Sequence, residues 1–408
     1  MEYNWEKRDI KISNMDIEWA NVSMSRNNLS PSQLFRNYFE KEIIDEVNTQ
    51  LRLQFNFGEK NVLENSPDCQ STIVSKSMSR NRLEHILSNI HCCDNNNLNK
   101  SDKFSNIRPL FDKLNSRFLH IAPMEPFHCV DEAMVPYFGI HGCKQFIRGK
   151  PLRYGYKLWV GATASGYIVW YEPYQGAKSA IKHCYKNLAL GPSVVLESIG
   201  ILQTKCKLSY SIYCDYFFNT LPLINTLTEK GVKCTGTIRE NCLGNCHLVS
   251  DADLKKHRGS YDFRVTDDNS IVTEKWSDNN MVHMASNDYG IFPLHQVSRY
   301  SHKGRRRIQQ QTIKNYNIYM ERVDRSDQNI SLYRIRGKKW YFPIIVPHLI
   351  NAAEQNAWQF HRKQGGKLDH LAFRRNVALM LIETNKENRG LNLCKRLRAW
   401  ARQTGSGP

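Results

Sequence analysis

The chain has 408 residues, of which 41% are hydrophobic and 11% aromatic, and this apolar content excludes a disordered protein. Its formal net charge of +18 indicates an anionic partner, and nucleic acid is the most common one. The polar start MEYNWEKRDIK and the short, proline-containing apolar stretch at 341–350 predict neither a secretory signal nor a membrane span. We therefore expect an intracellular protein.

Helical spacing of apolar residues is typical of the first third of the chain. A loose polar arm is expected over residues 1–28. A helix is expected in LSPSQLFRNYFEKEIIDEVNTQLRLQF with Ser30 or Ser32 as its N-cap, and a second is expected in SKSMSRNRLEHILSNIHCC. A third is expected in IRPLFDKLNSRFLHIA. These apolar stripes indicate the core of a helical part.

The period changes to that of strands after Pro126. FHCVDEAMVPYFG predicts a strand, while YGYKLWVGAT and YIVWYEPYQG predict a hairpin joined by ASG. A partly helical segment over residues 179–200, a strand at KLSYSIYCD, a helix at FFNTLPLINTLTEKG and a strand at KCTGTIR follow. This order predicts a mixed sheet in an α/β (α+β) fold.

The segment after residue 240 is more polar, with short strands predicted at SYDFRV, SIVTEKWS and MVHMASN. Because these strands differ from the long aromatic ones before them, we expect KWSDNNMVHMASN to belong to an insertion outside the central sheet, with Trp276 buried. From residue 312, TIKNYNIYMERVDRSDQNISLYRI returns to helical spacing.

Four aspartates are candidates for a metal site. Asp131 lies within the first predicted strand of the sheet, and Asp215 follows the fourth. Asp324 and Asp327 are three residues apart and share one side of a predicted helix. Carboxylates in these places are typical of ribonuclease-H-like nucleases, and Mg²⁺ prefers oxygen ligands of this kind. The alternative is that each is an exposed charge, paired on the helix with neighbouring arginines.

Basic segments border these acids. HGCKQFIRGKPLRYGYKLW interleaves cations with Phe146, Tyr154, Tyr156 and Trp159, so cations could neutralise phosphates while rings stack on unpaired bases. HKGRRR and RIRGKKW flank the third acid, and their alternative role is a nuclear-import signal. The cations expected to contact DNA are Lys144, Arg148, Lys150, Arg153, Lys157, Arg305, Arg306, Arg307, Arg336, Lys338 and Lys339.

Several of these segments together resemble piggyBac-type transposases and the cellular proteins derived from them. The resemblance rests on VDEAMVPYFG, KQFIRGKPLRYGYKLWV, YCDYFFNTLPLINTLTEKGVKCTGTIR, KWSDNNMVHMASN and YMERVDRSDQNISLYRIRGKKWYFPI. It implies that Asp131, Asp215 and Asp324 are catalytic and bind Mg²⁺ or Mn²⁺, with Asp327 as a fourth acidic position. It also implies a nuclear homodimer that cuts double-stranded DNA at terminal inverted repeats and joins it into TTAA.

The resemblance further implies a ribonuclease-H-like catalytic core, an insertion domain, and a flanking helical domain for DNA binding and dimerisation. On this basis the expected divisions are a disordered arm (1–28), a helical part (29–125), the first part of the core (126–240), the insertion (241–311), the helix of the third acid (312–333), the second helical part (334–395) and a basic tail (396–408).

Three features depart from the family pattern. Glu321 and Arg322 stand where two glycines are usual, a hydrophobic helix is missing between QFNFGEK and NVLENSPDC, and no cysteine-rich zinc domain follows CKRLRAWARQTGSGP. Two functions therefore stay open. One is a metal-dependent transposase in a copy that has partly degenerated, and the other is a domesticated DNA-binding protein without catalytic activity.

Overall fold

The computed structural model describes residues 3–10, 29–39, 79, 81–82, 92, 98–148, 152–176, 181, 185, 187–298, 306–332 and 339–383. They fall into two compact units. The first consists of Met1–Ser25 and Phe118–Asp327, and the second of Arg26–Arg117 and Gln328–Pro408. In the described part of the chain, none of the helices combines the length and the apolar character that crossing a bilayer would need.

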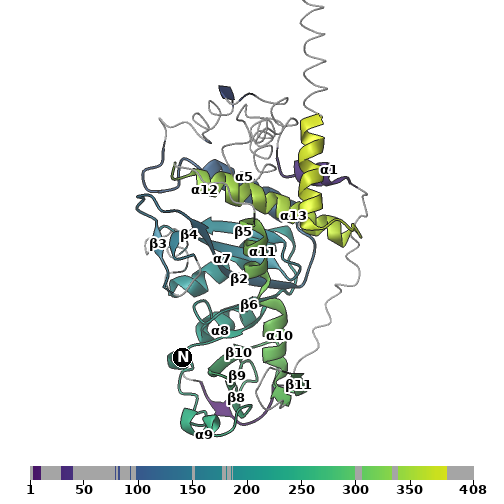
Figure 1. Cartoon of the computed structure of the whole chain (residues 1–408). Coiled ribbons are helices and arrows are strands. Elements are labelled where there is room, and N and C mark those ends of the chain that lie inside the picture. The colour runs from purple at the N-terminus through teal and green to yellow at the C-terminus, as the bar shows by residue number, and fades with distance from the viewer. Residues whose placement is uncertain are drawn as a thin grey trace, which may run out of the picture. The chain divides into compact units, whose positions relative to one another are not determined.

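A mixed sheet forms the centre of the first unit (Figure 1). Among the described residues its strand order is β1-β8-β9-β10-β7-β6-β2-β4-β3, with β5 also pairing with β4. The strands are β1 (Trp5–Glu6), β2 (Phe127–Pro136), β3 (Gln145–Phe146), β4 (Tyr154–Thr163), β5 (Ile168–Pro173), β6 (Ser211–Cys214), β7 (Lys233–Thr237), β8 (Tyr261–Thr266), β9 (Val272–Ser277) and β10 (Met281–Ser286). A separate ladder joins β11 (His295–Ser298) to β12 (Arg306–Gln309).

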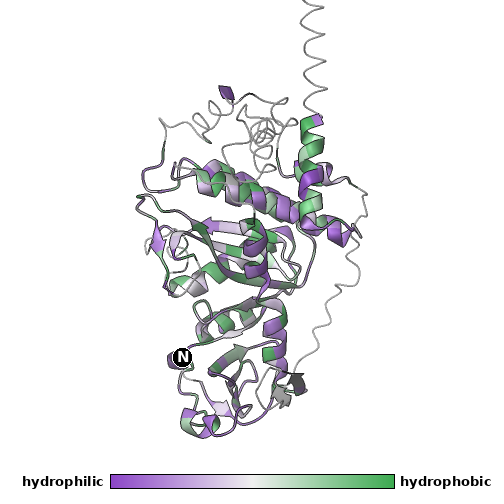
Figure 2. Cartoon of the chain, viewed as in Figure 1, coloured by the Kyte–Doolittle hydropathy of each residue, from purple (hydrophilic) through white to green (hydrophobic). Residues whose placement is uncertain are grey.

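The middle of the sheet has the order that the sequence predicts for a ribonuclease-H-like core. β2 and β4 are antiparallel, as are β4 and β5, whereas β6 is parallel to β2 and β7 is parallel to β6. Because both faces of this region are covered, β2 reads as an almost continuous buried run rather than an alternating one. Figure 2 shows hydrophobic stretches running through these central strands.

Helices connect and cover the parallel strands. α7 (Leu190–Lys205) precedes β6 and α8 (Leu221–Glu229) precedes β7. α7 lies so close to β4 that a Cβ atom on Gly161 would be 2.8 Å from Ser198 Oγ, which explains a glycine in mid-strand. α7 confirms that the segment predicted over residues 179–200 is helical in part, and it continues to Lys205.

The short strands after residue 240 correct one prediction. KWSDNNMVHMASN does not lie outside the central sheet, because β10 pairs antiparallel with β7 through Met284–Thr237, Ala285–Gly236 and Ser286–Thr235. β9 and β8 then extend the same sheet. The side chains explain why: Thr235 and Ser286 meet across the strands with their hydroxyl oxygens 2.7 Å apart, so the polar residues satisfy one another inside. Trp276 is buried as expected, 3% exposed.

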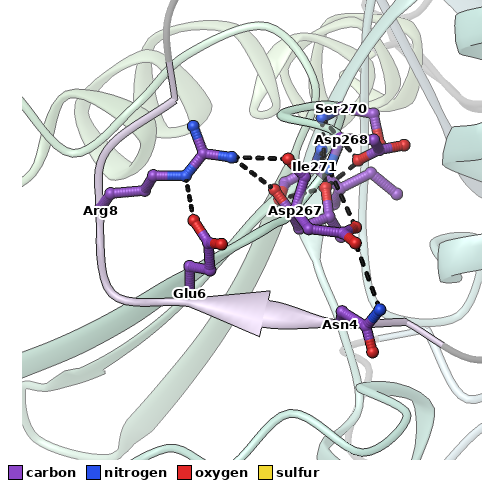
Figure 3. A network of polar contacts seen from close by, with 8 residues as sticks. Asn4, Glu6, Arg8, Asp267, Asp268, Ser270 and Ile271 are labelled. Carbon is purple, nitrogen blue, oxygen red and sulfur yellow. Dashed lines mark hydrogen bonds and ion pairs between the residues drawn. The ribbon is translucent and has the colours of Figure 1, made fainter.

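The N-terminal segment forms the outer edge of this extended sheet (Figure 3). Asn4 Nδ2 donates to the Asp267 carboxylate at 3.2 Å, and Arg8 Nη2 donates to the Asp267 carbonyl oxygen at 2.7 Å. Arg8 also pairs with Glu6 at 2.7 Å. These residues belong to the N-terminal segment that the sequence predicts to be disordered. For residues 3–10 this prediction is wrong, because their polar side chains bind a turn of the sheet.

Two helices follow the β11–β12 ladder where one was expected. α10 (Gln311–Tyr319) and α11 (Arg322–Ser331) are separated at Met320 and Glu321. The Arg322 side chain donates through Nε to the Ile318 carbonyl oxygen at 3.1 Å, so a side chain replaces a backbone donor at the end of α10. Asp324 consequently lies in the first turn of a new helix.

The second unit is helical in its described part. α1 (Pro31–Arg36) begins with a capping box in which Ser30 is the N-cap, as the sequence predicts. α12 (Phe342–Ile344), the π-helix η5 (Ile345–Ile350) and α13 (Asn351–Lys363) follow one another, and a helix over residues 370–383 packs a buried Arg374 against Glu354 at 3.0 Å. α5 (Arg108–Ile121) confirms the third predicted helix. The second, in residues 75–93, lies almost entirely outside the described residues.

Candidate active site

Adjacent parallel strands bring two of the predicted aspartates to neighbouring positions. Val130 of β2 pairs with Cys214 of β6, so Asp131 and Asp215 are the next residues along each strand. Asp131 is 9% exposed, and its Oδ1 accepts a hydrogen bond from the Glu132 N–H at 2.8 Å. Asp215 Oδ1 accepts from the Phe217 N–H at 2.8 Å, which turns the chain toward α8. Asp131 and Asp215 are far apart in the sequence, but the pairing of β2 with β6 brings them close together.

The third and fourth aspartates lie on α11, which is fixed to the sheet. Ser326 is 2% exposed, and its hydroxyl oxygen lies 2.7 Å from the Gly166 carbonyl oxygen in the β4–β5 turn. Asp324 is exposed and Asp327 is half-buried. Tyr319, at the end of α10, stacks on Phe127 with ring centroids 4.4 Å apart. These contacts set where Asp324 sits relative to β2.

Negative charge accumulates at this place. Burial raises the pKa of Asp131 well above its ordinary value, and the charges of Glu132, Asp215 and Asp324 raise it further. The pKa of Asp215 is also raised, chiefly by burial, although the Phe217 N–H and Lys157 oppose the shift. The structure therefore brings Asp131, Asp215 and Asp324 into one electrostatic cluster.

Glu132, the second carboxylate of the adjacent Asp131–Glu132 pair, forms an ion pair with Lys157. Lys157 Nζ lies 3.5 Å from Glu132 Oε2, and both side chains are largely buried, at 14% and 13% exposed. The ammonium group also lies over the rings of Trp159 and Phe217, at 4.2 and 4.8 Å from their centroids. Lys157, predicted as a DNA contact, is thus largely buried and paired with Glu132.

Two rings predicted to stack on bases cannot do so. Trp159 is 1% exposed and Tyr156 is 0% exposed, because Trp159 packs on Phe217 and Tyr156 stacks on Tyr137. This corrects the prediction, since the alternation of cations and rings in the sequence places Tyr156 and Trp159 inside the hairpin rather than on its surface. Phe146 and Tyr154 are exposed.

The other predicted DNA contacts are dispersed. Lys144 donates through Nζ to the Gly139 carbonyl oxygen at 2.8 Å, while Arg148 and Arg153 are exposed. Arg306 and Arg307 belong to β12, and Lys339 is exposed in the second unit. Lys150, Arg305, Arg336 and Lys338 lie outside the described residues.

The acidic site is chemically suited to a divalent cation. Its three carboxylates offer hard oxygen ligands, and burial, together with the charges of Glu132, Asp215 and Asp324, raises the pKa of Asp131. The ligand atoms of these three aspartates are not all within 4.8 Å of one another. Among the described residues, the group that meets this distance is Glu240, Asp251 and His283.

That second group already holds a cation, the ammonium group of Lys275. Lys275 is 3% exposed, and its Nζ lies 3.3 Å from Glu240 Oε1 and also contacts Asp251 Oδ1. The carboxylates and the ammonium group neutralise one another, so we interpret the group as an ion-pair cluster around the buried Lys275 rather than a metal centre.

Sequence reasoning missed Tyr316 as a neighbour of the acids. Burial raises the pKa of its hydroxyl, and the charges of Asp215 and Asp131 raise it further, so the side chain lies beside the cluster. Its position on the apolar side of a predicted helix gave no sign of this, because the signal appears only when α10 is placed on the sheet.

Comparison with known proteins identifies relatives of this chain. Residues 59–358 match a family model described as Transposase IS4. The chain is 45% identical over 329 residues to human PiggyBac transposable element-derived protein 3, covering 79% of this chain and 55% of that protein. It is 41% identical over 332 residues to human PiggyBac transposable element-derived protein 2, covering 79% and 56%. The chain thus spans about half the length of these curated relatives.

A solved structure shares the fold. A cryo-EM structure of the piggyBac transposase synaptic complex with hairpin DNA matches with a TM-score of 0.71 at 19% identity, over 89% of this chain and 82% of that one. This similarity confirms the expected mixed α/β fold with a ribonuclease-H-like core.

Proposed function

The chain belongs to the Transposase IS4 family, as a transposase-derived protein of the piggyBac type, and from this premise we propose that its first unit is a metal-dependent DNA strand transferase. Asp131, Asp215 and Asp324 would hold Mg²⁺ or Mn²⁺, and the substrate would be double-stranded DNA at terminal inverted repeats and TTAA. The observation that supports this proposal is that sheet register brings the buried Asp131 beside Asp215, while the charge of Asp324 on α11 also acts on Asp131.

Each protein group has a part in this chemistry. Two divalent ions, when bound, would activate the attacking oxygen and stabilise the leaving oxygen of a phosphoryl transfer. Asp215 is oriented by the Phe217 N–H, and Glu132, the neighbour of Asp131, is paired with Lys157. Asp327 lies one turn beyond Asp324 on α11, so we propose a supporting position whose loss costs less activity.

Several finer points accompany the proposal. A protein that acts on chromosomal DNA would work in the nucleus, and we propose a homodimer. We also propose that residues 29–125 and 334–395 provide dimerisation and further DNA contacts, with residues 241–311 as the family's insertion even though their strands join the central sheet. Within this segment, the ladder of β11 and β12 does not belong to the central sheet.

Strand cleavage tests the function directly. The purified chain is incubated with duplexes taken from both flanks of its own gene, with Mg²⁺ or Mn²⁺, and nicking is followed on a denaturing gel. Asp215→Asn removes the charge but keeps an acceptor for the Phe217 N–H, so we expect cleavage to be lost with the fold intact. Asp278→Asn, at an acid paired with Arg258 on another part of the sheet, is the matched control and should cut normally.

The result also separates the alternatives. Cleavage by the wild-type chain that persists in Asp215→Asn would contradict the assigned site. Binding of the same duplexes without any cleavage, in wild type and variant alike, would show a domesticated DNA-binding protein instead.

A further inference from the structure

The hairpin beyond the acidic site carries apolar side chains in an unusual place. We define the arm as the described residues 136–148 and 152–156, which run from the end of β2 through β3 to the start of β4. β2 continues past Val130, the partner of the last residue of β6, to Pro136, so the arm extends beyond the parallel strands (Figure 1). Its base is about 17 Å from Asp131 at ~3.3 Å per residue.

Four large apolar side chains of the arm face solvent. Phe138 is 78% exposed, Ile140 98%, Phe146 55% and Tyr154 45%. Phe146 and Tyr154 are cross-strand neighbours with ring centroids 4.9 Å apart. Single exposed apolar residues are ordinary, but a group of them on one hairpin indicates a binding surface.

An inner layer holds this surface in place. Tyr137 and Tyr156 stack with ring centroids 5.1 Å apart and are 8% and 0% exposed, and Cys143 is 1% exposed. The arm thus has a buried side that packs and an outer side that displays rings on a fixed backbone. Rings held in this way lose little conformational entropy when a ligand binds.

The charge of the arm selects the class of ligand. Residues 136–156 contain Lys144, Arg148, Lys150 and Arg153 and no Asp or Glu. Arg148 and Arg153 are exposed, and Lys144 Nζ lies 6.0 Å from the centre of the Tyr154 ring. Exposed rings among cations, in a segment without acidic residues, match a ligand that carries phosphates and flat bases, which is the combination of single-stranded nucleic acid.

We propose that the arm is a stacking platform for unpaired bases of single-stranded DNA. Phe138, Phe146 and Tyr154 receive the bases, and Arg148 and Arg153 neutralise the neighbouring phosphates. The inference rests on the proposed function, because strand cleavage at the acids would produce the unpaired strand that the platform holds. Tyr156 and Trp159, which the sequence offers for stacking, have no exposed face for this purpose.

Binding measured without cleavage tests the platform. The full-length chain is titrated, in EDTA, into a blunt fluorescent duplex and into the same duplex with a single-stranded overhang, and anisotropy gives both dissociation constants. Phe138→Leu keeps an apolar side chain but removes the ring, so binding of the overhang should weaken about tenfold while the blunt duplex is unaffected. Phe292→Leu, at a Phe that is 49% exposed outside the arm, is the control and should change neither constant.

A second readout reports stacking itself. 2-Aminopurine in the overhang should lose fluorescence on binding to the wild-type chain and to Phe138→Tyr, which restores a ring, but not on binding to Phe138→Leu. Thermal melting of each variant checks the fold.

Other results would overturn the proposal. Equal weakening on blunt and overhang DNA, or no weakening on either, rules out the platform, and so does binding to anionic lipid vesicles in place of the overhang preference. A chain that never cleaves DNA can still show the overhang preference, so failure of the proposed function and failure of the platform give different results.

Discussion

At the scale of single residues, the adjacent carboxylates of β2 have different environments. Glu132 is paired with Lys157 at 3.5 Å, whereas the donor that the structure shows for Asp131 among the described residues is the Glu132 N–H. A carboxylate raised in pKa by burial and like charges destabilises the fold whenever it is ionised. Functional sites of this kind commonly lower the folding stability of a protein.

This effect leads to a prediction for Asp131→Asn. Without divalent metal, the variant should melt at a higher temperature than the wild type near neutral pH, because it removes a buried charge that its neighbours repel. With Mn²⁺ the order should reverse, since only the wild type gains stability from metal binding, by about 2.7 kcal/mol at 100 times the dissociation constant. Thermal melts with and without Mn²⁺ measure both effects. An equal response of the two proteins to Mn²⁺ would exclude Asp131 as a ligand.

At the scale of elements, the sequence predicted strands and helices well where their periods are strong. β2, β4, β5, β6 and β7 lie where their apolar runs indicated, because buried strands need such runs. Placement in the sheet was harder. The composition of MVHMASN does not predict that β10 pairs with β7, because the pairing depends on which edge of the central sheet is free.

The candidate site shows the same limit. Aspartates in the right order indicated the cluster, but the pairing of Lys157 with Glu132 and the place of Tyr316 depend on register and helix placement. The turn between α10 and α11 likewise comes from a side-chain hydrogen bond of Arg322, which helix periodicity does not encode.

The packing of β9 under α10 gives a prediction about pH. Glu274 of β9 is 1% exposed, and burial raises its pKa from 4.5 to about 8, with the charge of Asp9 raising it further. Between these two values the folded chain holds a proton that the unfolded chain has lost. The resulting stabilisation is complete below the lower value and is lost as pH rises through the higher one.

Glu274→Gln should therefore remove this part of the pH dependence. We expect the wild type to lose stability as pH rises from about 5 to 8, and the variant to lose less and to be the more stable protein at the upper end. Denaturant unfolding at several pH values measures this. Glu229→Gln, at an exposed position of α8, is the control and should follow the wild type. Parallel stability curves for wild type and Glu274→Gln would contradict the assignment.

At the scale of the whole molecule, the excess of 57 Lys and Arg over 39 Asp and Glu is not spread evenly. Around β8 and β9, cations are paired with acids, as Arg258 is with Asp278 at 2.7 Å and Lys275 is with Glu240 at 3.3 Å. The arm, in contrast, carries cations without acids. Association with a polyanion should therefore depend on the cations of segments without acids and not on the total charge.

The salt dependence of DNA binding tests this distribution. Each phosphate that a cation neutralises steepens the slope of log affinity against log salt by about 0.9 on duplex DNA and about 0.7 on single strands. Arg148→Ala and Arg153→Ala should each flatten the slope by roughly one such step between about 50 and 200 mM salt, measured on the overhang duplex. Arg258→Ala removes an equal charge that Asp278 already neutralises, so its slope should equal that of the wild type. If all three variants flatten the slope alike, binding follows net charge alone, and the arm has no special part in holding DNA.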